Sequence, residues 1–142
     1  KDSTPFSVAL SALQDQIGYT FESDGLLRRA MTHSSFSGEN NKALSVLGAS
    51  IVETSASLSL LTLNIDISAM DLSRSVSETS KVEGSCTVDG TRLGLQKILR
   101  VSRNTNSSSP PVICGAFRAI FGAISIDSGS VDRATKIFLR VH

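Results

Sequence analysis

KALSVLGASIVETSASLSLLTL, residues 42–63, and PVICGAFRAIFGAISI, residues 111–126, decide the fold of this chain. Both segments are apolar or small nearly all round, and both are much longer than an ordinary strand. Pro111 suits the first turn of a helix, and the glycines and alanines of the two segments allow helix backbones to approach closely. We therefore expect these segments to form a buried central pair of helices.

The rest of the chain also has helical periodicity. Further helices are expected over residues 6–17, from 24 to about 33, around Met70 and Leu72, and over 77–91, 93–99 and 131–141. Gly18 is expected to stop the helix over 6–17, and Asp127-Ser128-Gly129 to end the one that begins at Pro111. The polar stretch SRNTNSSSPP, residues 102–111, is predicted to be a loop. No useful length alternates with period two, so the 142 residues, 40% of them hydrophobic, predict a single all-α domain over 1–142.

Charge and cysteine content limit the possible functions. Fourteen basic and 13 acidic residues leave a net charge of +1, so binding to nucleic acid should be modest and salt-dependent. Cys86 and Cys114 form no disulfide framework, and His33 and His142 are too few to complete a structural zinc site. We expect a reducing, intracellular compartment. No membrane span is expected, because no segment approaches 18 consecutive apolar residues.

Motifs for known chemistry are missing. The sequence has no phosphate-binding glycine loop, no nucleophile elbow and no zinc-protease motif, so no cofactor is predicted. Cys114 stands near a helix start, where a thiol can be activated, but a buried structural cysteine is the favoured interpretation. His33 is likewise interpreted as a structural, hydrogen-bonded residue.

Three segments together resemble the ribonuclease III endonuclease domain. LQDQIGYTFESDGLLRRAMTHSSF at 13–36 is similar to its opening helices and Thr-His-x-Ser turn. NKALSVLGASIV at 41–52 is similar to the signature Asn-Glu-x-Leu-Glu-Phe-Leu-Gly-Asp-Ala-Val-Leu, and ICGAFRAIFGAISIDSG at 113–129 to a second signature. The resemblance implies that family's all-α fold over nearly the whole chain. The short, serine-rich domain also resembles degenerate plant members of the nuclear-fusion-defective group.

The resemblance extends to the fold of the nuclease but not to its metal-binding carboxylates. In the family, carboxylates on these two helices hold Mg²⁺, which activates water against a phosphodiester. The matching positions here are all without a carboxylate: Lys42, Ser45, Ala49, Gly115 and Arg118. No metal site and no catalytic residue are therefore predicted. Displaced acids, Glu39, Glu53 and Asp127, are better interpreted as surface or turn-capping residues.

The resemblance also implies partners. Family members pair as twofold dimers through the first signature helix. The resemblance places Val46, Leu47 and Ile51 in that interface, with Val46 at the position of an aromatic residue that fits a socket on the partner. Either a homodimer or a heterodimer with another such chain is expected. Lys42, Arg118 and Arg74 are predicted to contact RNA phosphates, the first two because they replace acids that face the scissile phosphate. No double-stranded-RNA-binding domain is seen within 1–142.

Three functions remain open from the sequence. The favoured one is a non-catalytic domain that binds structured or double-stranded RNA or a ribonucleoprotein, as degenerate members do in organelles, so a mitochondrion or chloroplast is suspected. The second is a protein scaffold that uses the dimer surface. The third is a residual metal-dependent endoribonuclease with displaced carboxylates.

Overall fold

The computed structural model of the chain describes residues 4–142 and is all-α, as predicted. Within these residues there are eight helices and no strand, with one isolated bridge between Thr32 and Arg100. The helices are α1 (Pro5–Ile17), α2 (Asp24–Ala30), α3 (Lys42–Leu63), α4 (Ala69–Thr79), α5 (Ser85–Arg92), α6 (Leu95–Ile98), α7 (Pro110–Ser128) and α8 (Val131–Val141).

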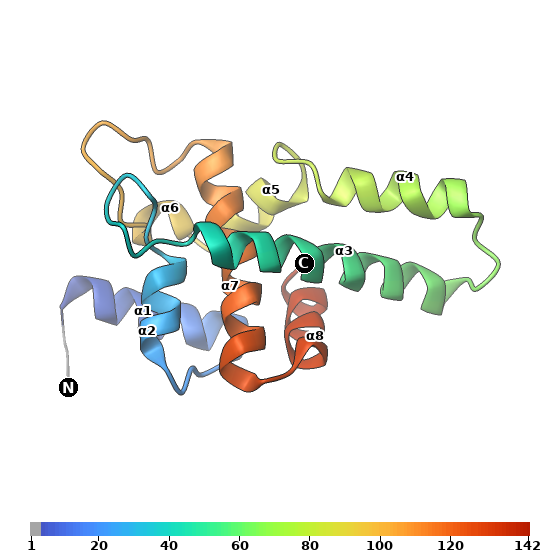
Figure 1. The fold of residues 1–142 in the computed structure, drawn as a ribbon, viewed down its shortest axis with the longest axis horizontal. Coiled ribbons are helices and arrows are strands. Elements are labelled where there is room, and N and C mark those ends of the chain that lie inside the picture. The colour runs from blue at the N-terminus through green and yellow to red at the C-terminus, as the bar shows by residue number, and fades with distance from the viewer. Residues whose placement is uncertain (1–3) are drawn as a thin grey trace.

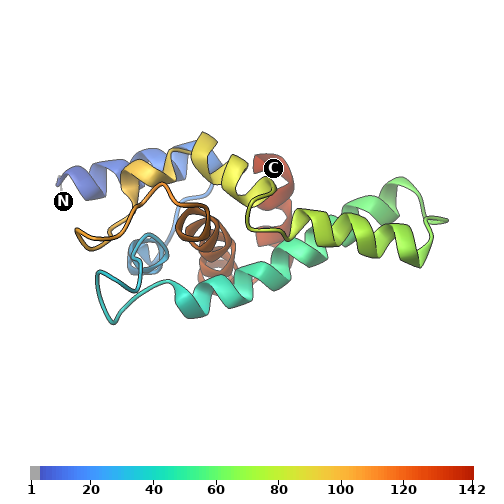
Figure 2. The same cartoon turned by 90° about the horizontal axis from the view of Figure 1, so that it is seen from above.

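Helix α7 is the centre of the domain. Seen from above, it stands almost end-on, with α2, α3, α5, α6 and α8 packed around it (Figures 1 and 2). Phe117 and Phe121 on α7 and Phe138 on α8 are at most 1% exposed and meet edge to face, with ring centroids 5.0 to 6.1 Å apart. These aromatic contacts fix α8 against α7.

Two glycines set the distance between α3 and α7. A Cβ atom on Gly48 would lie 1.7 Å from the carbonyl oxygen of Arg118, and one on Gly122 would lie 2.3 Å from the carbonyl oxygen of Leu44. No side chain fits in either place, so backbone packs directly on backbone. The close approach predicted from the small residues of the two segments is confirmed.

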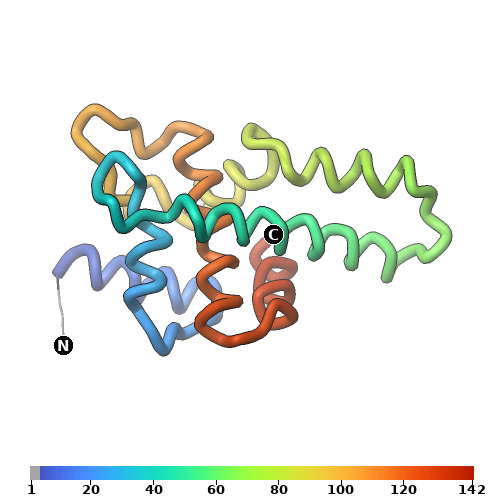
Figure 3. The backbone as a smooth tube through the Cα atoms, viewed as in Figure 1, coloured from blue at the N-terminus to red at the C-terminus, as the bar shows by residue number. Residues whose placement is uncertain are grey.

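The expectation that both long helices are buried is wrong for α3. Its first half crosses α7, but its second half pairs with α4 and projects from the body as an antiparallel arm (Figures 1 and 3). Leu58 is 50% exposed and Leu63 81%, and α4 contains no buried residue. Within residues 4–142 nothing covers the end of the arm, so burial in this domain does not account for the apolar composition of the second half of α3.

Several predicted boundaries need correction. The 77–91 helix is in fact the end of α4, a turn over 80–84, and α5, which begins after Gly84. Helix α2 ends at Ala30, short of the predicted residue 33, because the backbone N–H of His33 donates to the carbonyl of Arg100 instead (3.0 Å). The predicted ends at Gly18 and Gly129 are confirmed, both with positive φ (76° and 70°).

The prediction that Cys86 and Cys114 form no disulfide is wrong, whereas the interpretation of Cys114 as a buried structural residue is confirmed. Cys86 of α5 and Cys114 of α7 form a disulfide, with Cα atoms 5.0 Å apart and both side chains buried. Sequence spacing could not predict it, because the pairing depends on α5 packing against α7. A stable disulfide is unusual in reducing compartments, so the bond removes the argument from cysteine content for a reducing compartment. The localisation remains a prediction.

By length and hydropathy alone, α3 and α7 could each cross a membrane. The core helix of a globular domain meets the same criterion, and 67% of the most apolar window of α7 is buried inside the domain. For α3 the buried share is 28%, since its second half forms the arm.

Candidate functional site

The two signature segments meet at a small pocket. It has a volume of about 200 Å³ and lies between the start of α3, the first turns of α7 and the turn after α2. Of the predicted positions, Lys42, Ser45 and Gly115 line it. The other lining residues are His33, Ser34, Asn41, Pro111 and Val112.

Buried Asn41 fixes the position of Lys42. Its side-chain amide donates to the carbonyl of Ala30 (3.0 Å), and its backbone N–H donates to that of Thr32 (2.9 Å). These bonds join the start of α3 to the end of α2. Lys42 itself is exposed at the pocket edge, where its ammonium can meet solvent or an anion.

Gly115 leaves space at the bottom of this pocket. A Cβ atom added there would come no closer than 3.9 Å to another group, the Oγ of Ser45. Unlike Gly48 and Gly122, it is therefore not required by packing. The small residues at 45 and 115 leave open a volume that larger side chains would occupy.

The side chain of Arg118 does not reach the pocket beside Lys42, where the sequence placed it. Its Nη2 donates to the carbonyl oxygen of Ser80 (2.5 Å) in the turn between α4 and α5, and it does not line the pocket. The side chain of Arg118 therefore holds α7 to that turn and does not lie beside Lys42 and Ser45, and its contact with RNA phosphate stays a prediction. Ala49 does not line the pocket either.

The donor set does not fit a divalent metal ion. The five matching positions supply one ammonium, one hydroxyl, one guanidinium and no carboxylate, whereas Mg²⁺ needs oxygen ligands. Within residues 4–142, no three His, Cys, Asp or Glu side chains come together as a metal site. Glu39 pairs with Arg29 (3.5 Å), and Glu53 accepts from the Ser80 hydroxyl (3.4 Å).

Asp127, the third displaced acid, has a structural role. Its carboxylate accepts from the hydroxyl of Tyr19 (2.6 Å) and from the backbone N–H groups of Glu22 (3.0 Å) and Ser23 (2.8 Å). Burial opposes its ionisation, but these hydrogen bonds outweigh burial and hold the pKa of Asp127 below its ordinary value. Burial and the same hydrogen bond raise the pKa of Tyr19 to about 12.

His33 is held in the turn after α2. Its Nδ1 accepts from the backbone N–H of Ser35 (3.0 Å) and lies 2.8 Å from the Ser35 hydroxyl. That hydroxyl in turn accepts from the backbone N–H of Ser102 (3.0 Å). The interpretation of His33 as a hydrogen-bonded structural residue is therefore supported.

The predicted interface residues differ in exposure. Val46 is 73% exposed and free to meet a partner, whereas Ile51 is 2% exposed and packs in the core of its own domain. Leu47 is half-buried against that core. The assignment of Ile51 to a dimer interface needs correction, because on a helix residue 51 lies about 140° around the axis from residue 46.

Arg74 lies apart from the pocket. It is an exposed residue of α4, on the arm, and forms an ion pair with Asp71 one turn earlier (3.1 Å). Arg28, Arg29 and Arg100 line a separate pocket. The sequence did not predict this grouping, because α2 and residue 100 are distant segments of the chain.

Comparison with known proteins decides the family. The sequence model of a family described as Ribonuclease-III-like matches residues 23–141. The chain belongs to this family. Among its relatives is Protein NUCLEAR FUSION DEFECTIVE 2 of Arabidopsis thaliana, 58% identical over 140 residues, a match that covers 99% of this chain and 73% of that protein. Ribonuclease 3 of Thiobacillus denitrificans is 32% identical, with coverage of 91% of this chain and 58% of the bacterial enzyme.

A solved member has the same architecture. The nuclease domain of ribonuclease III from Campylobacter jejuni superposes with a TM-score of 0.86 at 27% identity, covering 91% of this chain and 92% of that one. Its description refers to structural flexibility in the region involved in dimer formation. The predicted ribonuclease III fold is confirmed, and so is the resemblance to the nuclear-fusion-defective group.

Proposed function

We propose that this ribonuclease-III-like domain binds structured or double-stranded RNA, alone or in a ribonucleoprotein, without cleaving it. One observation carries the proposal: the family's two signature helices keep their crossing, while the pocket beside it presents Lys42, Ser45 and Gly115 in place of acids. A lysine where a nuclease holds its metal can neutralise a phosphate directly. Duplex RNA is recognised through its backbone and shape, which does not require a strongly basic protein.

Lys42 is the residue that tests RNA binding most specifically. We expect Lys42→Gln to weaken binding to a duplex of about 20 base pairs and to reduce the dependence of affinity on salt by about one counterion. The matched control is Lys136→Gln, which removes the same charge from an exposed, ion-paired site on α8. An equal loss in both variants would indicate nonspecific attraction and contradict a role for the pocket. Arg118 is not part of this proposal, and Arg74 remains a secondary prediction.

The loss of the metal site can be tested by restoring it. A variant with Lys42→Glu, Ser45→Glu, Ala49→Asp, Gly115→Asp and Arg118→Glu would carry acids at all five matching positions. Space at Gly115 favours the change, because its nearest neighbour to an added Cβ is 3.9 Å away. We expect calorimetry to detect Mn²⁺ binding in the variant and none in the parent. A folded variant without Mn²⁺ binding would refute the assignment of these positions.

A second function, self-association or protein scaffolding, is favoured by exposed apolar side chains. Val46, Leu63, Ile65 and Met70 are between 71% and 81% exposed, three of them at the end of the arm. Burial of such side chains in a partner is worth about 1.5–3 kcal/mol each. We expect light scattering to detect a dimer that Val46→Asp weakens. A monomer at all concentrations, with RNA binding intact, would exclude dimerisation as a requirement for binding.

A further inference from the structure

Three polar side chains without partners meet at the small pocket beside Lys42, the Lys42 pocket. Lys42 is exposed at its edge, and Ser34 and Ser45 are half-buried residues that line it. Within residues 4–142, the ammonium of Lys42 and the two hydroxyl groups have no hydrogen-bond or ion-pair partner. Asn41, in contrast, donates its side-chain amide to the carbonyl of Ala30. The Lys42 pocket therefore presents three polar groups that are free to bind a ligand.

His33 adds a fourth donor. Its Nδ1 accepts from the backbone N–H of Ser35 (3.0 Å), so the ring hydrogen is on Nε2. The hydroxyl of Ser35 lies 2.8 Å from the same Nδ1 and accepts from the backbone N–H of Ser102, which leaves its own hydrogen for the ring. In the part of the chain that the structure describes, Nε2 has no partner. His33 therefore brings a free N–H group to the pocket that it lines.

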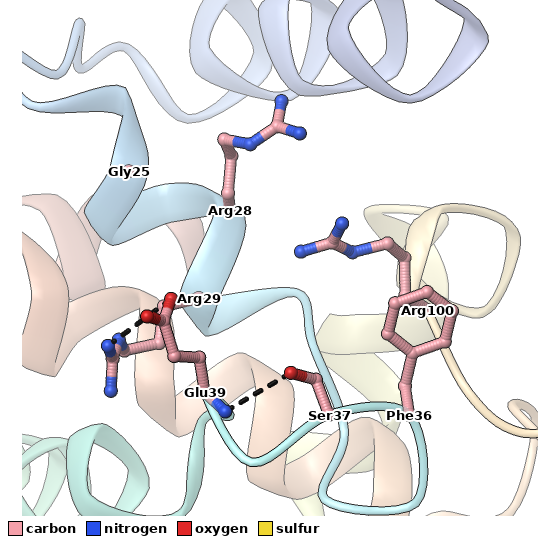
Figure 4. Close-up of a pocket in the computed structure, with 7 residues that line it drawn as sticks. All are labelled: Gly25, Arg28, Arg29, Phe36, Ser37, Glu39 and Arg100. Carbon is pink, nitrogen blue, oxygen red and sulfur yellow. Dashed lines mark hydrogen bonds and ion pairs between the residues drawn. The ribbon is translucent and has the colours of Figure 1, made fainter.

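No acidic residue lines the Lys42 pocket. Residues 31–41, which form the turn after α2, contain one acid, Glu39. Figure 4 shows its carboxylate turned toward Arg29, with which it pairs at 3.5 Å, and Glu39 lines a different pocket. An anion that accepts from the free donors therefore meets one positive charge and no negative charge in the pocket wall.

The size of the Lys42 pocket limits the kind of anion. Its volume of about 200 Å³ is below the roughly 300–1,000 Å³ of pockets that enclose a whole small-molecule ligand. The bottom is open beside Ser45, because a Cβ atom added to Gly115 would come no closer than 3.9 Å to the Ser45 Oγ. The space suits a compact group such as a phosphate, with the nucleoside that carries it outside the pocket.

The number of free donors distinguishes between two kinds of phosphate. A phosphate inside an RNA chain has two free oxygens and a single negative charge, whereas a terminal phosphate has three free oxygens and about two charges near neutral pH. The additional charge strengthens the attraction to the ammonium of Lys42. Four donor side chains are also used more fully by three oxygens than by two.

We propose that the Lys42 pocket binds the terminal phosphate of an RNA strand. Lys42 supplies the positive charge, and His33, Ser34 and Ser45 supply neutral donors to the phosphate oxygens. The RNA strand as the source of this phosphate rests on the proposed function. The preference for a terminal over an internal phosphate rests on the free donors and on the size of the pocket.

The preference is tested with three versions of one duplex of about 20 base pairs, whose ends carry 5′-phosphates, 3′-phosphates or only hydroxyl groups. Fluorescence anisotropy, with the label inside the duplex, measures the affinity for each version. We expect a phosphate at one or both kinds of end to tighten binding about tenfold, and the comparison of the two phosphorylated versions identifies the end. Equal affinity for all three would refute recognition of a terminal phosphate while leaving the proposed function intact.

Variants show whether the preference arises in the Lys42 pocket. Lys42→Gln should abolish the affinity ratio between phosphorylated and hydroxyl ends, and Ser45→Ala should reduce it. Gly115→Ala should also reduce it, because the new methyl group takes up space beside Ser45 without a change in charge. Lys136→Gln, the matched control, removes a charge from α8 and should leave the ratio unchanged. A ratio that persists in Lys42→Gln, or that falls equally in Lys136→Gln, would overturn the assignment.

The Lys42 pocket is also tested without a duplex. Uridine dinucleotides with a 5′-phosphate, a 3′-phosphate or neither are added to the ¹⁵N-labelled protein. We expect NMR shifts at residues 33–34, 42–45 and 115 with a phosphorylated form only. Such shifts without binding of any duplex would refute the proposed function and support the pocket as a site for phosphate ends. Shifts elsewhere, or equal shifts with all three dinucleotides, would refute the pocket.

Discussion

The contact between α3 and α7 makes a sharp prediction at Gly48. In Gly48→Ala the new methyl group would lie 1.7 Å from the carbonyl oxygen and 2.4 Å from the carbonyl carbon of Arg118. Both are backbone atoms of the central helix, so they cannot rotate away, and α3 must move. Overpacking of this kind costs about 1–3 kcal/mol. A contact of 1.7 Å with backbone atoms puts the cost at the upper end of that range. Alanine regains up to about 1 kcal/mol in helix propensity, so we expect a net loss of about 2 kcal/mol.

The assay is urea unfolding followed by circular dichroism at neutral pH. A loss of that size should lower the urea midpoint by about 1 M. Gly115→Ala is the matched control, since its methyl group would lie 3.9 Å from its nearest neighbour, the Oγ of Ser45, and should be neutral or stabilising by up to about 1 kcal/mol. If Gly48→Ala proved as stable as the parent, the close crossing of the two helices would be refuted.

Two other predictions concern the supports of the fold. Reduction of the disulfide, or the double change Cys86→Ser and Cys114→Ser, should lower the free energy of unfolding by about 3.5 kcal/mol. The loss comes from the entropy of a loop closed across 28 residues. If a reductant left the urea midpoint unchanged, this prediction would be contradicted. Asp127→Asn should cost about 1 kcal/mol at neutral pH. The pKa of Asp127 is lowered from 3.8, so its contribution to the free energy of unfolding is present above that pH and is lost as pH falls through the folded pKa. The stabilities of parent and variant should therefore converge in acid. A difference in stability that stays constant down to acid unfolding would be the contrary result.

The sequence predicted most of the helices, because periodicity and terminal glycines act locally. Gly18 and Gly129 end their helices as expected, and α7 is as buried as its composition indicates. The projecting arm could not be predicted in the same way. An apolar helix face has the same sequence pattern whether its own chain or a partner covers it. The five positions matched to the family's acids were assigned from the resemblance to the family signatures, and that assignment stays a prediction. Arg118 departed from expectation because its length lets it reach the Ser80 carbonyl.

The missed features depend on contacts between distant segments. Cys86 and Cys114 meet only because α5 packs on α7. Arg28 and Arg100 are 72 positions apart in the numbering, yet both contact the ring of Phe6. Neither pair has a local pattern, so only the folded chain brings them together.

The most direct test of the account is a single incubation of the domain with labelled duplex RNA and Mg²⁺, measured for both binding and cleavage at several salt concentrations. We expect binding that weakens steadily as salt rises, with RNA that stays intact. Cleavage products that form with Mg²⁺ and disappear with a chelator would contradict the central claim, and so would an absence of binding at low salt.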